Sequence, residues 1–184
     1  MKAKKTSSSS VAAKLIVTDK AGHKIASAPV VEAPPQFHIG KILVPVDFSE
    51  HSGKALRYAL AFAGQFGAEV TLVHIVEQMV YPGDWMYPPL AATDFATEKR
   101  GQVLEKLRAL DAGSGVKTKH VVRVGRAWQE VIEIAQEMKA DMIILATHGY
   151  TGLKHVLLGS VAEKIMRHAP CPVLSVRPEE RDFL

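Results

Sequence analysis

Residues 141–169 read DMIILATHGYTGLKHVLLGSVAEKIMRHA and contain an apolar strand, a glycine-rich loop and a helix, in that order. The run DMIILAT (141–147) is short and apolar, which is typical of a strand buried on both faces of a sheet. The glycines and the serine that opens the next helix indicate a backbone that comes close to a ligand or to another part of the chain. The same strand-to-helix alternation runs through the rest of the sequence.

Outward from this segment, four further strands are predicted in KILVPVD (41–47), AEVTLVHIVE (68–77), VKTKHVVRVG (116–125) and PVLSVR (172–177). Helical spacing of apolar residues predicts helices in the four intervening segments, which are 54–66, 93–113, 128–140 and 160–169. Strict alternation predicts an α/β domain with a doubly wound, open parallel sheet covered by helices on both faces. In the strand order 3-2-1-4-5, the carboxyl ends of the first and fourth strands flank one crevice, where such sheets bind ligands.

Charge divides the chain at about residue 37. The protein has 184 residues and a formal net charge of +4, of which 1–37 holds six of the 23 basic and two of the 19 acidic residues. The remaining 17 of each make 38–184 formally neutral, which argues against nucleic-acid binding. We expect 1–37 to be a basic, mostly disordered leader, although VAAKLIVTD (11–19) could pair as a short strand, and 38–184 to be the folded domain.

The remaining composition indicates a cytoplasmic protein. No apolar run approaches the length of a membrane helix, and the basic N-terminus does not resemble a secretory signal. Cys171, the single cysteine, is predicted to be a small core residue. The eight histidines form no metal-binding motif, and His74, inside a strand, is expected to be a hydrogen-bonded core or crevice residue.

The two strand ends that flank the crevice carry polar and small residues with two interpretations each. Asp47 can accept hydrogen bonds from a sugar or a base, but it can equally cap the next helix, a role that Ser49 could also fill. Gly159 and Ser160 open a helix whose N–H groups and dipole attract an anion, whereas Ser160 with Glu163 matches a capping box. Neither a P-loop nor a nucleophile elbow is present, so no catalytic constellation is predicted.

Taken together, KILVPVDFSEHSGKALRYA (41–59), LVHIVE (72–77) and the final block 146–178 resemble the universal stress protein family. The resemblance covers roughly 39–178. It implies the adenine nucleotide alpha hydrolase-like fold with strand order 3-2-1-4-5, a homodimer formed through the last strand, and, in some branches, ATP binding, possibly with Mg²⁺.

The ATP-binding signature of this family is Gly, two residues, Gly, nine residues, then Gly followed by Ser or Thr. Gly149, Gly159 and Ser160 match its later part, and Ala146 stands at the first glycine. The resemblance places Asp47 on the adenosine, with Pro45 and Ile75 lining its pocket. The positions it implies around the phosphates are Gly149, Gly159, Ser160 and Val161, with Leu145 and Ala146 beside the nucleotide.

The expected function is therefore a stress-response regulator that binds ATP and has at most slow ATPase activity. The alternative is a dimeric interaction module of the same fold that binds no nucleotide, which Ala146 and a capping box at Glu163 would favour.

Overall fold

The computed structural model describes residues 14–18, 21–29, 37–77, 90–148, 158–179 and 181, with only the backbone of 14–18, 24–29 and 90–99. The chain divides into two compact units, Met1–Phe37 and His38–Leu184. Among the described residues, no helix has both the length and the apolar character needed to cross a membrane.

The first unit contains a two-stranded antiparallel sheet. Strand β1 (Lys14–Thr18) pairs with β2 (Lys24–Pro29), with Leu15 opposite Ala28 and a register shift after Val17. We expected a mostly disordered leader, so these strands correct that expectation for 14–18 and 24–29 and agree with the alternative in which VAAKLIVTD pairs. The physical basis is the β-branched run in β1 and Gly22, whose φ of 85° in the intervening turn is favourable only for glycine.

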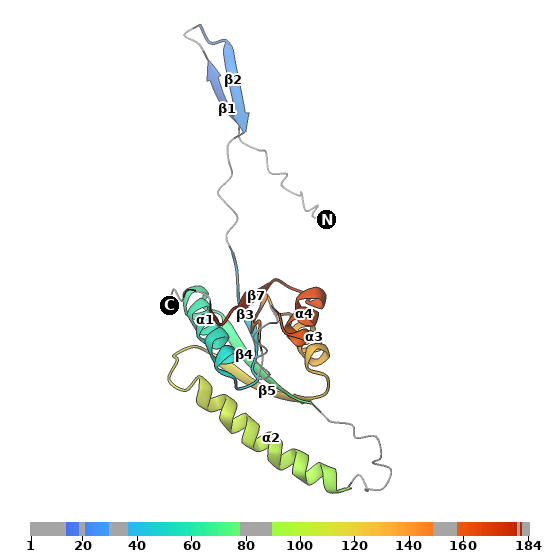
Figure 1. Cartoon of the computed structure of the whole chain (residues 1–184). Helices are drawn as coiled ribbons and strands as arrows, with labels where there is room; N and C mark the ends of the chain where they lie inside the picture. The colour runs from blue at the N-terminus through green and yellow to red at the C-terminus, as the bar shows by residue number, and fades with distance from the viewer. Residues whose placement is uncertain are drawn as a thin grey trace, which may run out of the picture. The chain divides into compact units, whose positions relative to one another are not determined.

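The second unit is built on five parallel strands (Figure 1). They are β3 (Lys41–Pro45), β4 (Glu69–Val76), β5 (Thr118–Val124), β6 (Met142–Ala146) and β7 (Val173–Val176). Their order in the sheet is β5-β4-β3-β6-β7, and every neighbouring pair is parallel. The predicted order 3-2-1-4-5 is confirmed.

Four helices cover the two faces of this sheet: α1 (Glu50–Phe66), α2 (Leu90–Leu110), α3 (Ala127–Met138) and α4 (Ser160–His168). Strand residues whose side chains alternate in direction supply two separate hydrophobic clusters. One lies between the sheet and α1 and α2, and the other between the sheet and α3 and α4. We call them the α1-side cluster and the α3-side cluster.

The winding direction reverses between β3 and β6, which are hydrogen-bonded neighbours with Ile42 opposite Met142. At the amino ends of these strands, Asp141 accepts hydrogen bonds from the N–H groups of Gly40 (2.8 Å) and Lys41 (2.9 Å) through Oδ2. The two central strands are thereby held in register, and their carboxyl ends, at Pro45 and Ala146, lie side by side at the opposite edge.

Candidate functional site

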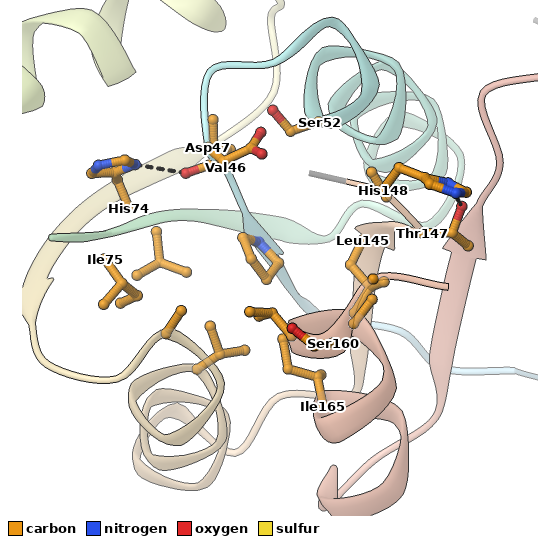
Figure 2. A pocket seen from close by; sticks show the side chains of 18 of the residues that line it. Val46, Asp47, Ser52, His74, Ile75, Leu145, Thr147, His148, Ser160 and Ile165 are labelled. Atoms are coloured by element: carbon orange, nitrogen blue, oxygen red, sulfur yellow. Dashed lines mark hydrogen bonds between the residues drawn. The ribbon is translucent and has the colours of Figure 1, made fainter. Parts of the chain in front are cut away.

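A cavity of about 540 Å³ lies at the carboxyl ends of β3, β4 and β6, between the first turns of α3 and α4 (Figure 2). Its size falls in the range of small-molecule sites. Eight of the nine residues predicted for the site line it, and Gly149 lies outside the described residues. The eight are Pro45, Asp47, Ile75, Leu145, Ala146, Gly159, Ser160 and Val161.

The turn after β3 presents the carboxylate of Asp47, which is half-buried at the cavity wall. Its Oδ1 accepts hydrogen bonds from the N–H (3.0 Å) and the Oγ (2.5 Å) of Ser49. The N-cap of α1 is Ser49, whose Oγ accepts from the N–H of Ser52 (3.2 Å), so the serine that the sequence offered as an alternative fills this role. Asp47 instead orients the cap, and its position beside the cavity suits a hydrogen-bond acceptor for a ligand.

No side chain among the described residues caps the first turn of α4. Gly159 is the N-cap, and the first hydrogen bond of the helix runs from the N–H of Glu163 to its carbonyl (2.9 Å). The N–H groups of Ser160, Val161 and Ala162 therefore precede the helical ladder at the cavity wall, where the helix dipole is positive.

The predicted capping box at this helix does not form. Glu163 is turned along the helix, where its Oε1 accepts a hydrogen bond from Nε of Arg167 (3.0 Å) and forms an ion pair with Nη2 of the same residue (3.0 Å). Because the N-cap is Gly159, Ser160 is the first helical residue and Glu163 stands one position beyond the N3 site that a capping box requires. The carboxylate that was expected to close this helix end is thus held elsewhere.

The first turn of α3, on the other side of the cavity, differs because a carboxylate from outside the helix binds one of its N–H groups. Glu77 follows β4 and its Oε1 accepts from the N–H of Ala127 (3.2 Å), the first residue of α3. Glu130 adds a second carboxylate in the same turn. Because negative charge already occupies this helix end, an anion entering the cavity is directed to α4. Glu77 was not assigned to the site from the sequence.

Gly159 lies close to the end of β6, where its N–H donates to the carbonyl of Thr147 at 2.8 Å. A Cβ at this position would lie 3.2 Å from the same oxygen. The glycine therefore lets α4 approach the end of β6 closely.

Ala146 is the last residue of β6 and is paired with Val176 of β7. Among the described non-glycine residues, positive φ values occur only at Phe48 and Lys139, so the backbone of Ala146 is ordinary for an alanine. Its side chain packs with the α1-side cluster, whereas its neighbour Leu145 belongs to the α3-side cluster that faces α4. The methyl group that departs from the glycine pattern is accommodated without backbone strain.

Two histidines also line the cavity. His74 of β4 contacts the carbonyl oxygen of Val46 through Nδ1 at 2.7 Å, which confirms the expected hydrogen-bonded crevice residue (Figure 2). His148 contacts Oγ1 of Thr147 through Nδ1 at 3.0 Å. Thr147 and His148 were not assigned to the site from the sequence, because their role follows from where the strand ends.

The described residues contain no group of three or more His, Cys, Asp or Glu side chains that could hold a metal ion. Cys171 is half-buried against the α3-side cluster, and burial raises the pKa of its thiol, which disfavours a reactive thiolate. The site consists of an acceptor, an open helix end and an apolar floor, which suits binding rather than covalent chemistry.

The comparisons with known proteins agree on one family. The model of the universal stress protein family matches residues 38–177. Universal stress protein MJ0531 of Methanocaldococcus jannaschii is 33% identical over 147 residues, covering 77% of this chain and 84% of that protein. Universal stress protein YxiE of Bacillus subtilis is 31% identical over 145 residues, covering 74% and 98%.

Among solved structures, that of MJ0577 from Methanocaldococcus jannaschii superposes with a TM-score of 0.63 at 30% identity, covering 79% of this chain and all of that one. A universal stress protein solved in complex with cAMP has a TM-score of 0.57 at 20% identity, covering 76% and 98%. One from Archaeoglobus fulgidus, solved with dAMP, has 0.53 at 20%, again covering 76% and 98%. Because the family model matches residues 38–177 and the fold agrees with that of solved family members, the chain belongs to the universal stress protein family.

Proposed function

We propose that this universal stress protein binds an adenine nucleotide, ATP in particular, in the cavity at the ends of β3, β4 and β6, and acts as a nucleotide-responsive regulator of a stress response. The observation that carries the proposal is the uncapped first turn of α4, which faces the same cavity as the carboxylate of Asp47. One end of the cavity thus suits phosphate and the other suits a sugar or base.

The charges around the cavity support one direction of binding. Phosphates placed at Ser160 and Val161 would meet the N–H groups of α4, whereas the first turn of α3 already holds the carboxylates of Glu77 and Glu130. Apolar residues of the sheet, such as Ile75, line the cavity wall where a base would lie. A Mg²⁺ ion would be held mainly by the phosphates of the ligand, because the described residues offer no cluster of carboxylates.

Related proteins agree with this ligand class at the level of the fold. The cAMP and dAMP complexes show that two proteins with this architecture accept adenine nucleotides. The alternative, an interaction module without nucleotide, was favoured by Ala146 and by a capping box at Glu163. The box does not form, and Ala146 has no positive φ, so neither observation favours the alternative.

The test is equilibrium binding of ATP to the purified full chain by titration calorimetry, with and without Mg²⁺. We expect Asp47→Ala to weaken binding about 10-fold or more, since hydrogen bonds to charged groups contribute about 1.5–3 kcal/mol. Glu105→Ala is the matched control, because it removes a carboxylate from the exposed surface of α2, 73% exposed in the side chain. Absence of binding by the wild-type protein at millimolar ATP and Mg²⁺ would refute the proposal.

Turnover is expected to be slow or absent, because the described residues contain no cluster of side chains that could hold a catalytic metal ion. Phosphate release measured on the same samples tests this expectation. Rapid, saturable release that is lost in Asp47→Ala would contradict it.

We further propose that the protein acts in the cytoplasm as a homodimer paired through β7. Within the sheet, β7 hydrogen-bonds only to β6 and is an edge strand, which leaves its outer backbone groups suited to pairing across a two-fold axis. Sedimentation velocity should give a dimer at tens of micromolar protein. A monomer throughout this range would argue against the pairing.

A further inference from the structure

His74 fixes the strand end from which Asp47 enters the cavity. The N–H of Val46 donates to the carbonyl of Val73 (2.8 Å), and the carbonyl of Val46 contacts Nδ1 of His74 (2.7 Å). Two consecutive residues of β4 therefore hold both backbone polar groups of Val46, which is 4% exposed. The residue that follows is Asp47.

The protonation of His74 follows from its partner. A carbonyl oxygen can only accept a hydrogen bond, so Nδ1 must carry the proton in the neutral ring. Free histidine favours the other tautomer, with the proton on Nε2. The structure thus predicts a tautomer that is imposed by the contact with Val46.

His74 borders the cavity, but its side chain leaves β4 on the other face of the sheet from that of Ile75. Its neighbours in β4, Val73 and Ile75, pack with the α3-side cluster that faces α4. Alternation along β4 directs the side chain of His74 to the opposite face of the sheet, as with Leu72 and Val76 of the α1-side cluster. This placement suits support of the strand end better than contact with a base that lies along Ile75.

The turn that His74 supports is strained. Phe48 has a φ of 63°, in the left-handed region that is unfavourable for a non-glycine residue. The Phe48 ring rests on the imidazole of His74, with ring centroids 4.7 Å apart. His74 therefore contacts the residues on both sides of Asp47, one through a hydrogen bond and the other through its ring.

We propose that His74 is a positioning residue for Asp47, which holds the turn 46–49 in the conformation that presents the carboxylate to the ligand. The proposal rests on the proposed nucleotide function for its binding readout. Loss of the Nδ1 donor should loosen the turn, whereas an amide that keeps a donor at the same place should preserve it.

The binding experiment compares three variants by ATP titration. His74→Phe keeps the ring contact and removes the donor, and we expect affinity to fall about tenfold, the size of one hydrogen bond that leaves its acceptor buried. In His74→Asn the amide nitrogen superposes on Nδ1, and affinity should stay within about twofold of wild type. His168→Phe is the matched control, since it also removes a histidine whose Nδ1 contacts a carbonyl (Lys164, 2.8 Å), but at the far end of α4.

A double-mutant cycle separates positioning from general damage. In the Asp47→Ala background, His74→Phe should have little further effect, because its action passes through the missing carboxylate. Inorganic tripolyphosphate, which lacks the groups that Asp47 would bind, should bind His74→Phe and wild type alike. An equal loss of ATP affinity in both backgrounds would overturn the proposal.

The ligand-free protein provides an independent test by nitrogen-15 NMR. We expect Nδ1 of His74 to be protonated and Nε2 to be unprotonated in the neutral ring, and the amide of Ser49 to exchange faster in His74→Phe than in His74→Asn. If wild type binds no ATP, the proposed function fails and these spectra still decide the role of His74. A proton on Nε2, or unchanged exchange at Ser49, would overturn the positioning role.

Discussion

Ala146→Gly restores the first glycine of the ATP-binding signature, and the structure predicts that the change lowers stability without improving binding. Ala146 ends β6 and has no positive φ, so a glycine brings no conformational relief. A glycine in a strand costs about 0.5–1 kcal/mol relative to alanine. Loss of the half-buried methyl group adds about half of the roughly 0.8 kcal/mol of a fully buried CH₂ group.

The expected destabilisation is therefore about 1–1.5 kcal/mol, which corresponds to a fall in Tm of about 2–6 °C for a domain of this size. Differential scanning calorimetry measures it, and ATP titration should give an affinity within about twofold of wild type. Ala140→Gly is the matched control, because Ala140 is also half-buried but precedes β6 at the amino edge of the sheet. An affinity raised fivefold or more by Ala146→Gly would refute the reasoning and show that the methyl group obstructs the ligand.

The reverse change at the later glycine completes this test. Gly159→Ala places a Cβ 3.2 Å from the carbonyl oxygen of Thr147, which is a backbone atom and can yield only by moving α4 or the end of β6. We expect this variant to bind ATP more weakly than Ala146→Gly does. Equal affinities of the two variants would mean that the approach of α4 to Thr147 does not matter for binding.

Two other predictions concern stability. His120 contacts both carboxylate oxygens of Asp111 through Nε2 (3.0 and 3.1 Å), and the Asp111 side chain is only 4% exposed. His120→Ala should cost about 1.5–3 kcal/mol in urea unfolding, whereas His120→Gln, with a donor at the same place, should cost less, and equal losses would contradict the pairing. Hydrogen bonds from Lys117 and then Lys119 lower the pKa of Glu69 in the folded state. The stability that Glu69 contributes is therefore present above its unfolded pKa and lost as the pH falls through its folded pKa. Glu69→Gln should destabilise the protein near neutral pH but not in acid. The expected loss is about 1 kcal/mol or less, because both lysines are largely exposed. A difference that persists unchanged in acid would exclude this assignment.

The architecture of the second unit could be predicted because strand-like and helix-like segments alternate regularly throughout its sequence. Buried strands such as KILVP (41–45) and MIILA (142–146) read as continuous apolar runs, and each is separated from the next by a helical repeat. The leader was harder to predict, because a polar, lysine-rich composition outweighed the β-branched run in Lys14–Thr18. Composition averages over a segment, whereas a hairpin needs only a few residues and a glycine turn.

The residues of the site also fall into two groups, namely those that a sequence motif identifies and those that it does not. Asp47, Gly159 and Ser160 carry the family pattern, and the structure brings them to one cavity. The capping box failed because the N-cap is Gly159, which puts Ser160 and Glu163 one position too far along the helix, and Glu163 bonds to Arg167 instead. His74 was expected only to be hydrogen-bonded, because its partner is the backbone of another strand.

This distinction changes how the glycine signature is interpreted. A glycine is demanded where a Cβ would meet a fixed atom, which holds at Gly159, because the carbonyl of Thr147 both accepts its N–H and occupies the space beside it. Ala146 stands in regular strand geometry, with its methyl group in the α1-side cluster, so the same physical demand is missing there. Within the described part of the signature, the residue that departs from the pattern is thus the one whose geometry does not require glycine. We therefore expect nucleotide binding to depend on the end of α4 and on the turn that holds Asp47, rather than on the identity of residue 146.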